Sequence, residues 1–187
     1  MADTNALTGT WTLDPAHTRI GFSARHAMVT KVRGHFAEFE GTAHIDGENP
    51  AASSVSVTIQ TASIDTNNQM RDDHLRTNDF LEVEKYPTIT FNSTKVEQVD
   101  EDTVRISGDL TIKQTTHQIS IDFEFGGLAQ DPFGNTRIGF EGSTSINRQD
   151  YGVAFNAALE TGGVLVSDKV GIDIEVAAVK VAVAADA

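Results

Sequence analysis

Apolar and polar residues alternate along most of this chain with a period of two. Between residues 117 and 125, Ile121 and Phe123 alternate with Asp122 and Glu124. Successive side chains of a β-strand point to opposite faces of its sheet, so this pattern predicts a strand with one apolar and one solvated face. The same alternation recurs over 18–26, 54–61, 103–113, 138–146 and 170–176. Such one-sided strands are typical of antiparallel sheets.

Turn-forming segments separate these runs. They read IDGENP at 45–50, VDEDT at 99–103 and GGLAQDPFGN at 126–135. Clusters of Gly, Pro, Asn and Asp between strand patterns are typical of hairpins and loops. Many short strands with no helix between most of them predict an all-β fold, either a sandwich or a closed barrel.

One segment, 65–87, loses the alternation and places apolar residues at helical spacing. Asn67 or Asn68 is suited to cap a helix N-terminus, and Pro87 prevents a helix from continuing. We therefore expect one or two short helices inserted between strands. A second irregular tract, 147–168, predicts a long loop at one rim of the fold.

Size and composition narrow the class of protein. The chain has 187 residues, enough for one domain with a substantial core, and it contains no cysteine for disulfides or thiolate sites. No stretch approaches the roughly 18 apolar residues of a membrane-spanning helix, so no stable membrane insertion is expected. The start, MADTNALTGTW, lacks the basic residues and apolar run of a secretory signal. A cytoplasmic location is therefore expected.

The charge balance excludes other partners. The chain has 14 basic and 27 acidic residues, for a formal net charge of -13. Proteins that bind nucleic acid gain most of their affinity by neutralising phosphates with Lys and Arg, so nucleic acid is not expected as a partner. Most of this surface would also repel anionic lipid headgroups. A ligand drawn from a membrane would have to be captured by something other than overall surface charge.

Residues that could support catalysis or hold a metal do not form a convincing set. His17, His26, His35 and His44 are spaced nine residues apart, yet no H-E-x-x-H or H-x-H pair exists, so we interpret them as architectural and expect no metal. The segment from Gly21 to Arg25 lacks the second glycine of a serine nucleophile elbow. The chain also has no glycine-rich phosphate loop or dinucleotide fingerprint. We therefore predict no cofactor and no enzymatic activity.

Neighbouring carboxylates at Asp72 and Asp73 could in principle perform acid–base chemistry if one of them were desolvated. They fall in the polar helical segment, so a solvated helix face or a helix N-terminal charge is the preferred interpretation.

Four ordered blocks of sequence resemble a known family. They read WTLDPAHTRIGFSARH with V-x-G-x-F after it, RDDHLRTNDFLEVEKYPTITFNS, SGDLTIKQTTHQISIDFEF and GFEGSTSINRQDYGV, and they span about Trp11 to Val179. Together they are similar to the YceI-like family of polyisoprenoid-binding, lipocalin-like proteins. Relatives often carry a glycine in the turn after the L-T-I segment, where this chain has Gln114. Many relatives are also exported, whereas no secretory signal is seen here.

The resemblance implies a single antiparallel lipocalin-like β-barrel of about eight strands with an elongated apolar cavity. The domain would cover 11–180, between a flexible N-terminus at 1–10 and a C-terminal tail at 181–187. The expected ligand is one long-chain amphiphile, such as a polyisoprenoid, an isoprenoid quinone or a fatty-acyl lipid, which the protein would sequester or carry.

We expect the inward-facing apolar residues to contact this ligand. They are Phe22, Phe36, Ile59, Phe91, Ile106, Ile121, Phe123, Phe140 and Ile174. An eight-stranded barrel can hold one small ligand or be filled by its own side chains. Small inward residues at Gly108, Gly142 and Thr144 favour an open cavity, although a glycine can equally mark a bend or bulge.

The segment 71–87 allows two interpretations. Arg71, His74 and Asp79 could meet a ligand headgroup while Phe80, Leu81 and Tyr86 close the barrel as a lid. Alternatively, the polar residues fix the segment to the barrel and the apolar ones plug its end, which is the preferred interpretation. Trp11 is likewise expected to plug a rim.

Two alternative functions stay open. The first is an enzyme that acts on a hydrophobic substrate inside a lipocalin-like barrel. The second is a filled barrel that acts as an interaction module through its surface or through a homodimer edge.

Overall fold

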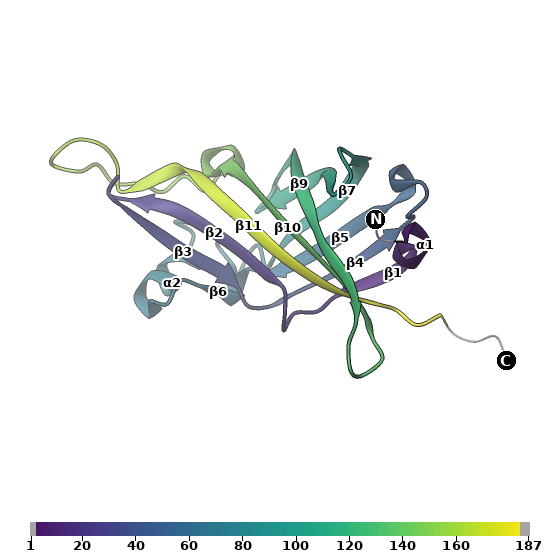
Figure 1. Ribbon diagram of the computed structural model, residues 1–187. Coiled ribbons are helices and arrows are strands. Elements are labelled where there is room, and N and C mark those ends of the chain that lie inside the picture. The colour runs from purple at the N-terminus through teal and green to yellow at the C-terminus, as the bar shows by residue number, and fades with distance from the viewer. Residues whose placement is uncertain (1–2, 184–187) are drawn as a thin grey trace.

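Eight antiparallel strands close into a barrel in the computed structural model, which describes residues 3–183 (Figure 1). In sheet order they are β1 (Gly9–Leu13), β4 (Phe39–Ile45), β5 (Ser54–Gln60), β7 (Thr88–Gln98), β8 (Thr103–Ile112), β9 (Thr115–Gln130), β10 (Thr136–Asn147) and β11 (Val166–Lys180). Pairing of β1 with β11, from Trp11 opposite Lys180 to Leu13 opposite Ala178, closes the ring. The predicted antiparallel barrel of about eight strands is confirmed.

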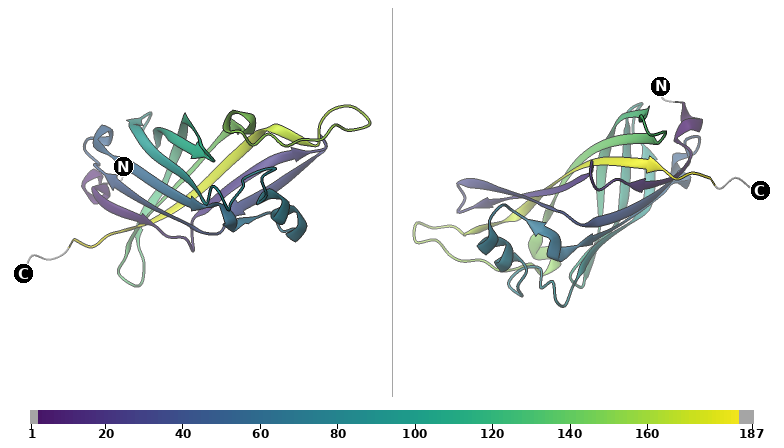
Figure 2. Two further views of the ribbon diagram at one scale, coloured as in Figure 1. Left: turned by 180° about the vertical axis from the view of Figure 1, so that it is seen from behind. Right: turned by 90° about the horizontal axis from the view of Figure 1, so that it is seen from below.

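Three further strands extend the wall beyond the closed ring. They are β2 (Arg19–His26), β3 (Thr30–Phe36) and β6 (Ile64–Asp65). The C-terminal part of β11 pairs with β1, whereas its N-terminal part pairs with β2, for example Ile172 with Phe22. The β2–β3 hairpin therefore projects past the barrel, and it ends beside the loop that precedes β11 (Figure 2).

The strand register confirms the alternation between inner and outer faces. Ile121 and Phe123 are only 6% and 8% exposed. Asp122, between them, lies on the outer face, where it accepts a hydrogen bond of 2.6 Å from Nε of Arg105 on the paired strand. A shift of one residue in the strand register would have moved each of these side chains to the opposite face of the sheet.

Within residues 3–183, the remaining elements are two α-helices and three 3₁₀ segments. The helices are α1 (Thr4–Leu7) and α2 (Gln69–Leu75), and the 3₁₀ segments are η1 (Pro50–Ala52), η2 (Thr61–Ser63) and η3 (Arg148–Tyr151). Asn68 is the residue that caps α2, because its side chain accepts a hydrogen bond from the backbone N–H of Arg71.

Regular structure begins within 1–10, the stretch expected to be a flexible N-terminus. Helix α1 and the start of β1 at Gly9 both lie within that stretch. The Trp11 side chain explains this, because it is fully buried and its indole N–H donates to the Leu7 carbonyl over 2.8 Å. Of the tail expected at 181–187, residues 184–187 lie outside the described part of the chain.

Candidate functional site

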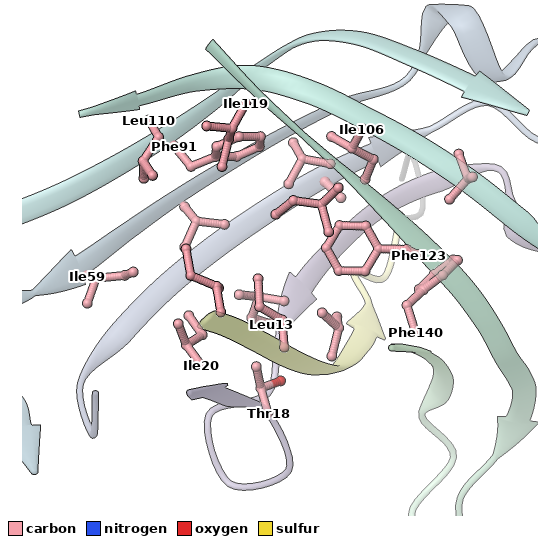
Figure 3. Close-up of a pocket in the computed structure, with 18 of the residues that line it drawn as sticks. Leu13, Thr18, Ile20, Ile59, Phe91, Ile106, Leu110, Ile119, Phe123 and Phe140 are labelled. Atoms are coloured by element: carbon pink, nitrogen blue, oxygen red, sulfur yellow. The ribbon is translucent and has the colours of Figure 1, made fainter. Parts of the chain in front are cut away.

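The barrel encloses an apolar cavity of about 920 Å³ (Figure 3). Its lining comes from all eight barrel strands and from β2, β3 and β6. All nine residues predicted to face a ligand line this cavity: Phe22, Phe36, Ile59, Phe91, Ile106, Ile121, Phe123, Phe140 and Ile174. The volume lies near the upper end of the roughly 300–1,000 Å³ usual for small-molecule sites.

Glycines on the inner face allow aromatic rings to lie against the barrel wall. Gly142 on β10 is paired with Phe123 on β9, and a Cβ atom at Gly142 would approach Cδ1 of Phe123 to 2.7 Å. A Cβ atom at Gly108 would likewise lie 2.6 Å from Cζ of Phe91.

This arrangement corrects one part of the sequence interpretation. The space beside these two glycines is taken by phenyl rings, and a ligand does not gain it directly. Because the rings can lie along the backbone, they leave the centre of the barrel open. Thr144, the third small residue, is only half-buried and is not part of the cavity lining.

The cavity lining becomes polar and acidic at the end next to α1. Asp46 comes from the turn after β4, and Asp100, Glu101 and Asp102 come from the turn between β7 and β8. Hydrogen bonds from the backbone N–H groups of Asp102 and Thr103 hold the pKa of Asp100 below its ordinary value. This rim is therefore negatively charged at neutral pH.

A buried arginine at the other end of the cavity was not anticipated from the sequence. Arg148, 4% exposed, donates to the carbonyls of Val153, Phe155 and Ser167 over 2.7, 2.8 and 2.9 Å. Burial lowers the pKa of this guanidinium, and Asp168 at 3.5 Å partly offsets the effect. The side chain fixes the loop before β11 to the barrel end. In the sequence, Arg148 lies in the motif NRQDYG, which resembles an ordinary polar turn and does not indicate a buried arginine.

Tyr151 closes the same end of the cavity. It is 2% exposed, and its ring packs edge-on against His117 with centroids 5.1 Å apart. Its hydroxyl has no hydrogen-bond partner among the described residues, and burial raises its pKa. The hydroxyl is therefore buried and uncharged at neutral pH.

Of the six residues proposed to form a headgroup contact or lid, Phe80 and Leu81 line the cavity. The other four do not, and they are engaged within the end cap. Arg71 donates to Thr66, His74 forms a 2.7 Å hydrogen bond with Asp79, and the Tyr86 hydroxyl lies 3.3 Å from Oε1 of Gln114.

The ring of His74 also packs edge-on against Phe80 and Phe155, with both centroid distances at 5.0 Å. These contacts favour the interpretation that the segment is a plug. A ligand contact at Arg71, His74, Asp79 or Tyr86 stays a prediction.

The neighbouring carboxylates of α2 have different environments. Asp73 is exposed and pairs with Arg76, as expected for a solvated face. Asp72 is only 7% exposed, so it is not on a solvated face, but it lies in the first turn of α2, as the alternative of a helix N-terminal charge expects. Asp72 is buried because it accepts hydrogen bonds from both the backbone N–H and the hydroxyl of Thr66, at 2.9 and 2.6 Å.

The histidines in the described residues do not converge. His17 bonds to Asp14 at 2.7 Å and His44 to the hydroxyl of Thr10 at 3.0 Å. Within residues 3–183, no group of three or more His, Asp or Glu side chains is placed to hold a metal ion. No helix in the same range combines the length and apolar character needed to cross a membrane.

Comparison with known proteins supports this architecture. The family model described as YceI-like domain matches residues 11–178. A UPF0312 protein of Ectopseudomonas mendocina is 42% identical over 137 residues, which cover 73% of this chain and 72% of that protein.

Solved structures share the same fold. The Campylobacter jejuni YCEI protein is 34% identical, with a TM-score of 0.72, and the match covers 91% of this chain and 97% of that one. A polyisoprenoid binding domain from Saccharophagus degradans, implicated in plant cell wall breakdown, is 17% identical with a TM-score of 0.70. That match covers 91% of this chain and 98% of the domain.

Proposed function

The chain belongs to the YceI-like family, and from this membership we propose that it binds one long-chain amphiphile inside its barrel. The observation that carries the proposal is the continuous apolar cavity of about 920 Å³. A polyisoprenoid, an isoprenoid quinone or a fatty-acyl chain has the length and apolar character that this cavity requires. The polyisoprenoid-binding description of the Saccharophagus degradans domain, which shares the fold, supports the same class of ligand.

The apolar lining favours a long chain over a short one. Each methylene group removed from water contributes about 0.8 kcal/mol, whereas association costs about 4–15 kcal/mol in lost freedom. A chain of fewer than about ten carbons would barely offset that cost, while about fifteen or more could bind without a polar anchor. The headgroup then needs only loose contacts at the mouth.

Charge at the polar rim favours an uncharged headgroup. Asp100, Glu101 and Asp102 border the cavity at the α1 end, so an anionic headgroup placed there would be repelled. A hydroxyl, carbonyl or amide would meet no such penalty. We therefore place neutral amphiphiles ahead of phosphorylated or carboxylated ones.

The contents of the cavity also bear on the two alternative functions. A filled barrel would leave no chamber of this volume. An enzyme would need reactive polar groups that face the substrate, and the two buried polar side chains at the closed end, Arg148 and Tyr151, do not supply them. Arg148 is bonded to backbone carbonyls, and the Tyr151 hydroxyl is enclosed. These observations support a carrier or a sequestering protein.

Native mass spectrometry of freshly purified protein tests the proposal. We expect an adduct that solvent extraction removes and identifies as a long-chain lipid. After delipidation, fluorescent or isotope-labelled chains of graded length should rebind, with affinity rising steeply above about ten carbons. Only apo protein in the native spectrum, together with no rebinding of any chain, would overturn the proposal.

A further inference from the structure

The β2–β3 hairpin has a charge opposite to that of the rest of the molecule. The segment 15–37 contains four of the chain's 14 basic residues and none of its 27 acidic residues. Three of the four, Arg25, Lys31 and Arg33, are exposed near the projecting end of the hairpin. A surface that repels anions almost everywhere is therefore locally basic at this one projection.

The basic side chains are placed where they repel one another. Arg25 lies directly opposite Lys31 in the antiparallel pair, and Arg33 is opposite Ser23 on the same outer face. Like charges placed directly opposite across two strands destabilise the pair. None of the three basic residues forms an ion pair with another described residue.

On the paired strand β11, exposed Asp173 lies opposite Gly21 and exposed Glu175 opposite Arg19, both toward the barrel end of β2 and away from the tip. The loop before β11 carries exposed Glu160, and the start of β11 carries exposed Asp168, which lies 3.5 Å from Arg148. Lys169 follows directly and is also exposed. On the other side, β6 presents Asp65 opposite His35, away from the tip.

The tip of the hairpin exposes apolar side chains. Met28 is 65% and Val29 74% exposed, and Val164 in the neighbouring loop is 41% exposed. The two segments are in contact, because the Ala27 N–H donates to the Leu165 carbonyl over 2.8 Å and the Met28 sulfur occupies the space beside Gly163. They lie side by side at the far end of the molecule from α1 (Figures 1 and 2).

The turn at this tip has an unfavourable sequence for its backbone. Ala27 and Met28 both have positive φ, at 50° and 62°, and the Val29 N–H bonds to the His26 carbonyl over 3.0 Å. Two-residue turns with this pattern favour Asn-Gly, because other residues are strained at positive φ. An exposed methionine there gains little from packing within the protein. Local strain of this kind at an exposed tip suggests a functional role.

We propose that this tip docks on the surface of a bilayer that contains anionic phospholipids. Arg25, Lys31 and Arg33 meet the headgroup phosphates, while Met28, Val29 and Val164 enter the interfacial layer. Basic residues next to exposed apolar ones are the combination that binds peripheral proteins to anionic membranes. The acidic remainder of the surface is repelled by the same bilayer, which orients the molecule with the tip toward it.

Vesicle cosedimentation tests this proposal with the full chain. The probes are vesicles of phosphatidylcholine alone and vesicles of phosphatidylcholine with one quarter phosphatidylglycerol. Each basic side chain near such a surface contributes about 1 kcal/mol, or roughly fivefold in affinity. We expect Arg25→Gln/Lys31→Gln to weaken binding to the anionic vesicles by at least tenfold. We also expect Met28→Ser/Val29→Ser to reduce it and high salt to abolish it.

Two matched variants control for charge and for apolar exposure. Lys95→Gln removes a 63% exposed cation on β7, and Phe133→Ser removes an 88% exposed ring at the β9–β10 turn. Neither should change vesicle binding. Every variant should unfold cooperatively near the wild-type temperature and should still bind a long-chain probe in solution.

Several outcomes would overturn the proposal. These are absence of wild-type binding to anionic vesicles, equal and salt-independent binding to neutral ones, or equal losses in the control variants. Self-association that Met28→Ser/Val29→Ser abolishes, without vesicle binding, would instead show that the tip is a contact between copies of the chain. Loss of vesicle binding with retained probe binding separates this surface from the cavity.

Discussion

Arg137 joins two carboxylates that are distant in the sequence. It donates to Asp14, in the turn after β1, over 2.6 Å and to Asp131, in the β9–β10 turn, over 2.7 Å. These hydrogen bonds are the main reason that the pKa of each carboxyl lies below its ordinary value. The cluster ties the long β9–β10 hairpin to the closing strand of the barrel.

The first prediction is that Arg137→Gln destabilises the protein in a pH-dependent way. A carboxyl whose pKa is lowered by folding stabilises the folded state above its unfolded pKa of about 3.9 and loses this effect as pH falls toward the lowered value. The difference in unfolding free energy between wild type and variant should therefore be largest near pH 6 and shrink below about pH 4. Urea unfolding across pH 3–7 measures it, with Lys95→Gln as control. A pH-independent difference would contradict the assignment.

Phe123 and Asp122 test the two faces of β9. In a filled core, Phe→Ala costs about 3–5 kcal/mol. Phe123 borders an open chamber, so Phe123→Ala should destabilise the apo protein by less than that and shift the preferred ligand toward longer or bulkier chains. Asp122→Ala removes only an exposed ion pair with Arg105 and should change neither property appreciably.

Denaturant unfolding of the apo protein and a binding series of graded chains measure both variants. A full core-sized loss for Phe123→Ala, with unchanged ligand preference, would show that the interior behaves as a packed core.

At the scale of elements, period-two alternation predicted six of the strands and their inner faces, namely β2, β5, β8, β9, β10 and β11, and it did not single out β1, β3, β4, β6 and β7. Each residue's face depends only on its own strand, so local sequence reports it. The cap at Asn68 and the irregular tract after β10 were predictable for the same reason. The Gly142–Phe123 and Gly108–Phe91 contacts were not, because they depend on which strands pair and in which register. The roles of Arg148 and Asp72 also depend on partners that the fold brings together.

Gly142 provides a test of the aromatic packing on the wall. Gly142→Val should push the Phe123 ring away from the backbone and into the cavity, because the new Cβ would overlap the ring. The variant should then prefer shorter chains. Combining it with Phe123→Leu should partly restore the wild-type preference, since the two residues are in contact. Ser143→Val, on the outer face opposite Asp122, is the matched control and should leave ligand preference unchanged.

The β2–β3 turn should show a trade-off between stability and docking. Ala27→Asn/Met28→Gly places the favoured dipeptide at two positions with positive φ, so it should stabilise the protein by about 1–2 kcal/mol or more. Thermal unfolding would show a higher melting temperature, and vesicle cosedimentation would show weaker binding because Met28 is lost. A lower melting temperature would show that the Met28 contact with Gly163 stabilises the fold more than the turn strains it.

At the scale of the whole molecule, charge is distributed along the length of the barrel. The acidic rim lies at the end next to α1, and the basic hairpin tip projects from the opposite end (Figure 1). The apolar cavity extends between them and is lined from both ends of the barrel. An anionic group is therefore attracted to the outside of one end and repelled from the cavity rim at the other.

This distribution predicts how the protein selects among headgroups. A long-chain alcohol should bind more tightly than the monophosphate of the same chain, and added salt should narrow the difference because it screens exposed charges beyond about 10 Å. Glu101→Gln/Asp102→Asn removes two exposed rim carboxylates and should narrow the difference in the same way. Glu141→Gln/Glu175→Gln removes the same charge from a facing pair on the outer wall and should have little effect. Competition between the two ligands at low and high salt measures the preference directly.

If both double variants change this preference equally, net charge would explain the selection. If neither salt nor the rim variant changes it, the headgroup is bound away from the acidic rim.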